Sequence, residues 1–154
     1  MTSIAWPDAD SVPSVPCKGE RTTVLVVGVH DGDTFSALLP FGGAFLKINV
    51  RLLGVDAPEI KVRDAARKGT PLAALEEQAG AAVRDALLPL LLRREVAIKP
   101  ISHDKYGGRL LAECWLPDGQ SLSAYLLERG FARAYKGDAK QPWTEAELRR
   151  ILTT

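Results

Sequence analysis

β-Branched and aliphatic residues gather into short runs in the first third of the chain, and polar residues alternate with them most clearly in Lys47–Leu53. A two-residue period of this kind is typical of a strand with one buried face. Clusters of glycine, proline and aspartate separate the runs and indicate turns. We therefore predict three consecutive antiparallel strands that form a meander. The predicted strands are Thr22–Val29, Thr34–Leu39 and Ala44–Leu53, with turns at His30–Asp33 and Pro40–Gly43.

The apolar spacing then lengthens to three or four residues, which predicts a helix that opens at Pro71, after a loop over Ile60–Thr70. Because Pro89 has no amide hydrogen to donate, we expect it to kink this helix or end it near Leu88. The predicted apolar face is Leu75, Ala79, Val83, Ala86 and Leu90, and the charged residues that fall elsewhere are Glu76, Glu77, Arg84 and Asp85.

Two more strands and two short helices are predicted in the rest of the chain. Ser121 is a helix N-cap and Gly130 a helix stop, while Thr144 and Glu147 have the spacing of a capping box. The predicted elements are strands Val96–Ile101 and Arg109–Leu116 around a turn at Ser102–Gly108, a helix from Ser121 to about Arg129, an extended segment Phe131–Tyr135 and a last helix to Ile151.

Five short strands with a helix between the third and the fourth is the element order of an OB-fold barrel. The predicted class is therefore α+β, with further helices at the C-terminus. A chain of 154 residues suits one domain of this kind. We place the domain at residues 22–154 and interpret residues 1–21, which are rich in proline and small polar residues, as a flexible tail.

Composition narrows the possible classes of protein. The net charge of +1 excludes a strongly basic protein that binds nucleic acid mainly through bulk electrostatics, but it allows a local positive patch. No apolar run approaches the length of a membrane span, so we expect no membrane partner, and we expect a monomer. No signal peptide is visible, which predicts a cytoplasmic protein unless the sequence begins after a removed signal. Two cysteines do not make a disulfide framework, and Cys114 lies in an apolar run typical of a buried thiol.

The stretch Arg51–Glu59 carries the first candidate chemistry. Here a predicted strand runs into a turn that Gly54 and Pro58 mark, so its ionisable side chains gather at one end of the sheet. A carboxylate for a metal ion (Asp56), a second as general base (Glu59) and an arginine for a phosphate (Arg51) are what metal-assisted phosphodiester hydrolysis needs. The alternative is a charged strand edge followed by an ordinary turn.

A second candidate is Asp31-Gly32-Asp33-Thr34, between the first two predicted strands. Asp33 and Asp56 come from neighbouring strand ends, and two carboxylates can share a hard cation such as calcium. Asp-Gly is also a common hairpin signal, so turn formation is the competing interpretation. We favour metal binding for Asp33, and either turn formation or a supporting role for Asp31.

The third candidate is the glycine-rich turn from Asp104 to Arg109. Arg109 offers a second forked donor for a phosphate, while Lys105 and Tyr106 suit a flanking phosphate or base. Taken alone, the turn is better interpreted as a flexible, solvated hairpin. Its value comes from its combination with the two stretches above.

Together these stretches resemble the thermonuclease (staphylococcal nuclease) family. The resemblance rests on residues 29–34, 50–59 and 104–112 and on the segment Gly130-Phe131-Ala132-Arg133-Ala134-Tyr135. It covers about Thr22 to Tyr135, and the combination is far more specific than any single stretch.

The resemblance implies a role for each matching residue. It assigns Arg51, Glu59 and Arg109 to catalysis, and the carboxylates of Asp33 and Asp56 with the backbone carbonyl of Ala57 to calcium. Residues that would contact the bound nucleotide are Lys105, Tyr106 and Tyr135. The implied function is a calcium-dependent endonuclease that cuts DNA and RNA with little sequence preference.

One departure from the family pattern concerns Arg109. The family has arginine directly after the glycine of Asp-x-Tyr-Gly-Arg, whereas Gly108 intervenes here. A strict register would put Gly108 in the catalytic position, and a bulge at Gly108 would restore Arg109; we favour the bulge because glycine suits one. The alternative function is a non-catalytic OB-fold module that binds single-stranded nucleic acid.

Overall fold

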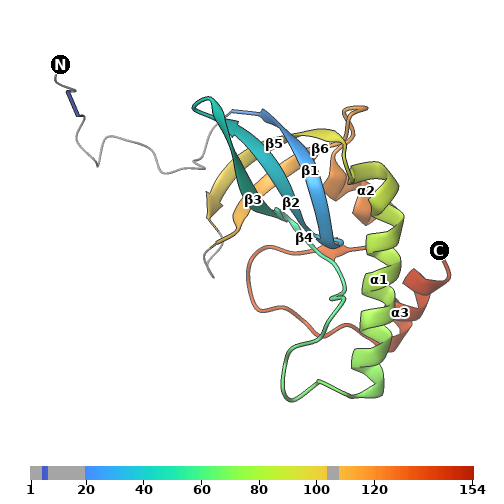
Figure 1. Cartoon of the computed structure of the whole chain (residues 1–154). Coiled ribbons are helices and arrows are strands. Elements are labelled where there is room, and N and C mark those ends of the chain that lie inside the picture. The colour runs from blue at the N-terminus through green and yellow to red at the C-terminus, as the bar shows by residue number, and fades with distance from the viewer. Residues whose placement is uncertain (1–4, 7–19, 104–107) are drawn as a thin grey trace.

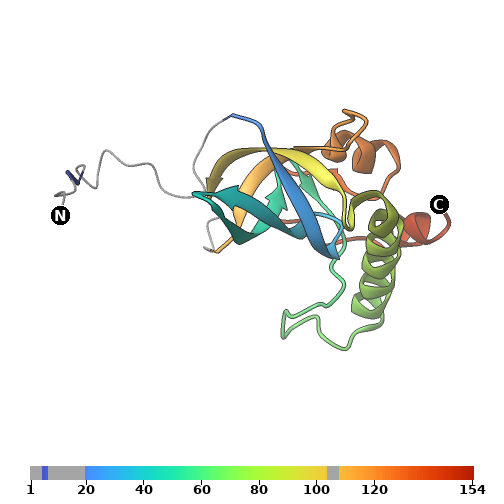
Figure 2. The same ribbon diagram turned by 45° about the horizontal axis from the view of Figure 1, so that its top comes forward.

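The computed structural model describes residues 5–6, 20–103 and 108–154 of the chain. In these residues five strands close into a barrel in the order β1-β2-β3-β6-β5, with three helices outside it (Figures 1 and 2). The predicted α+β OB-fold barrel is thus confirmed. The barrel strands are β1 Thr22–Asp31, β2 Thr34–Phe41, β3 Ala44–Leu52, β5 Glu95–His103 and β6 Leu110–Trp115, and the helices are α1 Pro71–Leu91, α2 Leu122–Glu128 and α3 Glu145–Leu152.

The β1-β2-β3 meander is antiparallel as predicted, and β1 pairs with β5 to close the barrel. The predicted turns were too long. β1 continues through Asp31 and β2 through Phe41, which leaves two-residue turns at Gly32–Asp33 and Gly42–Gly43. Two-residue turns let the ladder of strand hydrogen bonds run to the end of each hairpin. Because the first turn is so short, Asp33 is placed directly at the barrel rim.

Helix α1 connects the meander to β5 and stands beside the barrel, where α3 packs against it (Figure 1). Of the two effects predicted for Pro89, the helix end near Leu88 is wrong, because the helix passes through Pro89 to Leu91. A proline near the end of a helix removes only one hydrogen bond. Leu87 and Leu91 on either side are buried and hold the last turn in place.

The buried face of α1 is rotated relative to the predicted one. Leu75, Ala86 and Leu90 are only partly buried. Glu76, which we expected outside the apolar face, is 2% exposed and therefore belongs to the buried face. The buried residues of the helix are Ala73, Glu76, Ala79, Gly80, Val83, Leu87 and Leu91.

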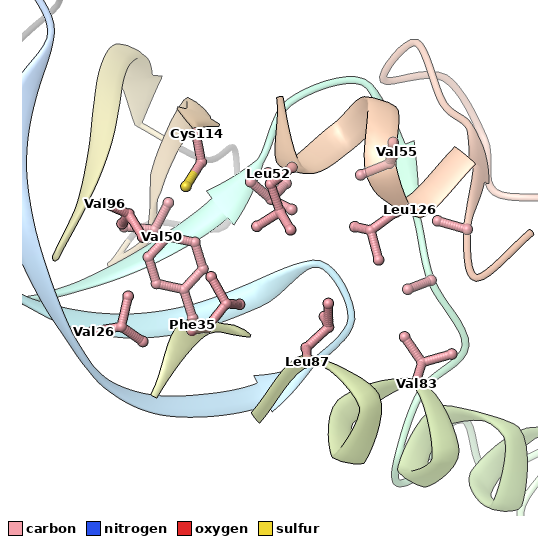
Figure 3. Close-up of a cluster of buried hydrophobic side chains, with 14 of the residues drawn as sticks. Val26, Phe35, Val50, Leu52, Val55, Val83, Leu87, Val96, Cys114 and Leu126 are labelled. Atoms are coloured by element: carbon pink, nitrogen blue, oxygen red, sulfur yellow. The ribbon is translucent and has the colours of Figure 1, made fainter. Parts of the chain in front are cut away.

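The core fills the barrel and continues beneath the helices. Figure 3 shows Leu87 of α1 facing Phe35 of β2, and Leu126 of α2 beside Val55. Cys114 of β6 lies in this core as predicted, and its burial raises the pKa of the thiol to about 12. No helix in the described ranges is long and apolar enough to span a membrane.

A second, two-stranded sheet lies next to the barrel, formed by β4 (Val55–Asp56) and β7 (Arg133–Ala134). We predicted a turn where β4 lies and an extended segment where β7 lies. The antiparallel pairing sets Asp56 opposite Arg133. Helix α2 leads into β7. The predicted N-cap of this helix, Ser121, is confirmed, and Gly130 follows the end of the helix with φ +71°. The capping box of α3 at Thr144 and Glu147 is also confirmed.

Candidate active site

The ends of β1, β3 and β4 converge at one rim of the barrel. Strand pairing sets Thr34 opposite Arg51, and the amide of Leu52 donates to the carbonyl of Asp33 at 2.8 Å. Asp56 follows within a few residues on β4. The short hairpin turn and the β3–β4 connection therefore bring together Asp33, Arg51 and Asp56, as their positions at strand ends predicted.

Asp33 is held from both sides and is 3% exposed. Its Oδ1 accepts from the hydroxyl of Thr34 at 3.0 Å, and its Oδ2 accepts from the amide of Ala57 at 2.8 Å. The second bond ties the β1–β2 turn to the residue that follows Asp56. The two predicted metal-binding carboxylates consequently belong to one rigid unit.

Arg51 lies between the two aspartates, with Nη2 3.5 Å from Asp33 Oδ2 and 3.9 Å from Asp56 Oδ1. Its Nη1 donates to the carbonyls of Leu52 at 2.9 Å and Val55 at 2.8 Å. These two bonds fix the plane of the guanidinium, which is an advantage for a forked donor that must meet an anion in one orientation. At 6% exposure the side chain is more buried than a surface arginine.

Two cations that the sequence reasoning missed also meet Asp56. Arg133 Nη2 lies 3.3 Å from Asp56 Oδ2, and Lys140 Nζ lies 2.9 Å from Asp56 Oδ1 and 3.8 Å from Glu59 Oε1. In the sequence, Arg133 was only one residue of the Gly130–Tyr135 segment and had no assigned role. In the structure it lies opposite Asp56, whose negative charge explains a basic residue at this position. Lys140 lies in a segment without periodicity, so no local signal pointed to it.

Glu59 stands at the edge of this cluster, with its side chain 43% exposed. Partial burial raises the pKa of its carboxyl, and the charges of Asp33 and Asp56 raise it further, while Lys140 lowers it. Burial alone would lower the pKa of Lys140, but its hydrogen bond to Asp56 and the charges of Asp56 and Asp33 raise it overall. Because Asp33 and Asp56 are buried, the carboxylate of Glu59 is more accessible to solvent than either of theirs.

Asp31 is the last residue of β1 and not part of the turn. Its Oδ1 is buried and has no hydrogen-bond partner among the described residues. Burial raises the pKa of this carboxyl to about 9, together with the charge of Asp33 and a hydrogen bond to it.

A cavity of about 360 Å³ opens beside the cluster and is bordered by Arg51, Arg109 and Tyr135. Arg109 precedes β6 instead of starting it, and Gly108 has φ +76°, a conformation that glycine adopts readily. The bulge at Gly108 stays a prediction, because residues 104–107, including the candidates Lys105 and Tyr106, lie outside the described residues. The remaining lining residues are Leu52, Leu53, Gly54, Ser102, His103, Leu111, Lys136, Gly137 and Lys140.

The oxygen-rich donor set suits a hard cation. No group of three or more His, Cys, Asp or Glu side chains in the described ranges is placed to hold a metal ion by itself. The predicted set needs only Asp33, Asp56 and the carbonyl of Ala57, and water completes calcium sites of this kind. The carboxylates of Asp31, Asp33, Asp56 and Glu59 gather here, and after burial their mutual repulsion is a further cause of the raised pKa values of Asp31 and Glu59; a cation would relieve this repulsion.

A comparison with protein families agrees with this geometry. The family model described as "Staphylococcal nuclease homologue" matches residues 49–153, more than half of the chain. The chain belongs to this family. The matched range contains Arg51, Asp56, Glu59 and Arg109, and it begins after Asp33.

Two curated relatives of this chain come from Escherichia coli. An "uncharacterized endonuclease" of Escherichia coli O157:H7 is 28% identical over 111 residues, which cover 72% of this chain and 60% of the relative. A protein of Escherichia coli with the same name matches to the same extent. The chain thus spans about three fifths of the length of these relatives.

Proposed function

We propose that this chain is a calcium-dependent endonuclease that hydrolyses phosphodiester bonds of DNA and RNA with low sequence preference. The observation that carries the proposal is the arrangement of Asp33 and Asp56 around a fixed Arg51, with Glu59 linked to Asp56 through Lys140, beside a cavity that Arg109 also borders. Family membership supports a nuclease, and the two relatives are named endonucleases.

The proposed ligands of calcium are the carboxylates of Asp33 and Asp56 and the carbonyl of Ala57. When bound there, calcium supplies a positive charge that polarises a phosphate oxygen. Glu59 accepts a proton from the attacking water, because it is the carboxylate of the cluster that solvent reaches most easily. Its raised pKa brings it closer to neutral pH, which favours general-base catalysis.

The two arginines contribute hydrogen bonds to the phosphate. The Nη2 of Arg51 makes only long ion pairs with the two aspartates, at 3.5 and 3.9 Å, and so keeps capacity to donate to a phosphate, while Nη1 holds the group in place. Arg109 borders the same cavity from the residue before β6, the strand that pairs with β3 at Val50 and Arg51. Donors that are already oriented stabilise the charge that builds up in the transition state. Lys105, Tyr106 and Tyr135 are the proposed contacts to the rest of the nucleotide.

Cleavage of single-stranded DNA and of RNA, with calcium or with a chelator, tests the proposal. We expect cleavage that needs calcium and that falls by about 10²–10⁴-fold in Glu59→Ala. Glu95→Ala, which removes an exposed glutamate at the start of β5, is the matched control and should retain full activity. Binding of the strand without cleavage would instead support the non-catalytic OB-fold module.

The role of Arg109 has its own test. Loss of one oriented donor to a transition state typically lowers the rate by about 10²–10³-fold, so we expect at least that loss in Arg109→Ala. Arg94→Ala removes an exposed arginine outside the cavity and should leave the rate unchanged. Full activity of Arg109→Ala would show that Gly108 holds the catalytic register and that the predicted bulge is wrong.

A further inference from the structure

A buried carboxylate lies outside the proposed catalytic set. Glu76, in the second turn of α1, is 2% exposed, whereas glutamate is almost never fully buried unless it is paired. Its Oε1 accepts from the backbone amide of Glu59 at 3.4 Å, and its Oε2 forms an ion pair with Arg67. One buried carboxylate is therefore shared by two residues of the segment that joins β4 to α1.

The segment 57–70 leaves the barrel, runs out beside α1 and returns to the first turn of that helix (Figures 1 and 2). Glu59 lies near its beginning and Arg67 near its end, so Glu76 closes the segment as a clamp. The neighbouring Glu77 adds a second attachment, since its Oε1 accepts from the amide of Val62 at 2.9 Å. Glu76 thus holds the backbone at Glu59 itself, whereas Glu77 holds the segment further along, at Val62.

Gly80, one turn further along α1, gives independent evidence for the same attachment. A Cβ at this position would lie 2.5 Å from the carbonyl oxygen of Glu59 and 2.7 Å from that of Pro58. Glycine inside a helix costs about 1 kcal/mol relative to alanine, so its presence needs a reason. The reason is that the helix backbone packs directly against the two residues that position the Glu59 side chain.

We infer that Glu76 is a positioning residue for Glu59, and that its ion pair with Arg67 holds the segment in the active geometry. This inference rests on the proposed function, in which Glu59 is the general base. The Glu59 side chain is 43% exposed, so its placement depends on its backbone. Misplacement of a reacting group by about 1 Å can lower a rate about 10²-fold.

The test compares Glu76→Ala, Glu76→Gln and Arg67→Met. We expect Glu76→Ala to lower kcat about 10²-fold and to change KM less than about threefold. Glu76→Gln should lower kcat less than Glu76→Ala does, because its amide oxygen can still accept from the amide of Glu59. Arg67→Met should lower kcat to the same extent as Glu76→Gln, because it also removes the ion pair and keeps that acceptor. Calcium affinity should stay within about twofold in a calorimetric titration, because the contacts of Glu76 do not include Asp33 or Asp56.

Two controls separate positioning from a general loss of stability. Glu77→Ala removes the same side chain from the same helix turn, but its attachment is at Val62, so kcat should fall less than about threefold. In a Glu59→Ala background, Glu76→Ala should add less than about twofold, because effects of coupled residues do not multiply. Full multiplication of the two losses, or a kcat for Glu76→Ala within threefold of the unchanged protein, would overturn the inference.

Hydrogen exchange tests the clamp without any activity. We expect the amides of residues 59–67 to exchange at least about tenfold faster in Glu76→Ala, with barrel amides unchanged, as in local opening. If the unchanged protein cuts neither DNA nor RNA, the proposed function fails while this measurement still decides the clamp. Unchanged exchange in both Glu76→Ala and Glu76→Gln would overturn the positioning role.

Discussion

The two turns of the β1-β2-β3 meander have the same length and both contain glycine, but their surroundings differ. At Gly32–Asp33, a Cβ on the glycine would lie 2.7 Å from Ala57 Cβ and 2.7 Å from Val83 Cγ1. At Gly42–Gly43, a Cβ would meet nothing within 4 Å, and the nearby Phe45 is 70% exposed. We call them the packed turn and the open turn.

The difference shows how the fold selects the place for chemistry. Both turns end a hairpin of the same barrel, but α1 and the segment that follows β4 cover only the packed turn, through Val83 and Ala57. This cover excludes water from Asp33 and brings further ionisable side chains within a few ångströms. In such surroundings charges interact more strongly than at an open turn, where solvent screens them. The candidate site therefore lies at the end of the barrel that has a second layer.

The largest expected effect comes from adding a side chain at the packed turn, where there is no room for one. Gly32→Ala forces Ala57 or Val83 to move, and overpacking of this kind typically destabilises by about 1–3 kcal/mol. Displacement of Ala57 also disturbs its hydrogen bond to Asp33, so we place the loss at the upper end, about 3 kcal/mol, with activity falling in parallel. Urea unfolding in chelator measures the stability.

The open turn provides the matched control for this substitution. Gly43→Ala meets no neighbour but must adopt φ +79°, which costs a residue with a side chain about 1 kcal/mol. Its activity should stay within twofold of the unchanged protein. Equal losses of stability at the two turns would show that backbone conformation, and not packing, distinguishes them.

The next effect concerns the acid at the packed turn. Asp31 has a pKa of about 9 in the folded protein, whereas the ordinary pKa of an aspartate is 3.8, so folding takes up a proton between these pH values. Stability should therefore fall as pH rises through this window, and Asp31→Asn should remove that fall. We expect Asp31→Asn to stabilise the metal-free protein by about 1–3 kcal/mol at pH 7 and to have no effect below about pH 4.

Thermal unfolding in chelator over a pH series measures this effect. Asp118→Asn changes an exposed acid in the β6–α2 turn, where asparagine can still accept from the amide of Gln120, and should leave the pH profile unchanged. A loss of stability in Asp31→Asn at pH 7 would contradict this prediction, because it would mean that the ionised carboxylate of Asp31 has a favourable partner.

Elements and motifs that depend on neighbours in sequence were predictable. Alternation predicted β3, the caps Ser121 and Thr144 predicted two helix starts, and the motif positions predicted that Asp33, Arg51 and Asp56 meet. The strand ends were harder, because a hairpin ladder extends as far as its partner allows. This is why β1 includes Asp31 although its sequence suggests a turn.

Features that depend on tertiary contacts were missed. β4 has two residues and forms only because β7, far along the chain, pairs with it. Glu76 looked like a solvent-facing charge, since its burial requires a partner, Arg67, from a segment without periodicity. The spacing Ala73, Glu76, Gly80 was the available signal, because a glycine and an acid on one helix stripe suit close backbone contact better than solvent.

The smallest expected effect concerns the ion pair between Lys140 and Asp56. Lys140 Nζ lies 2.9 Å from Asp56 Oδ1, a proposed calcium ligand atom, so a bound ion and this ammonium compete for the same oxygen. Its side chain is 44% exposed, and a partly solvated ion pair contributes only about 0.5–1 kcal/mol. Lys140→Met should therefore raise calcium affinity about two- to fivefold and slightly lower the stability of the metal-free protein.

A calorimetric calcium titration and unfolding in chelator provide the two readouts, which must move in opposite directions. Lys136→Met is the control, because Lys136 borders the same cavity but, among the described residues, forms no ion pair with Asp56. Removal of either lysine makes the cavity less positive, so a general field effect would raise calcium affinity equally in both variants. A gain in calcium affinity confined to Lys140→Met would show direct competition for Asp56. Equal gains in the two variants would show that Lys140 acts only through the general positive charge of the cavity. Arg51 and Arg133 would then be the cations that balance Asp33 and Asp56.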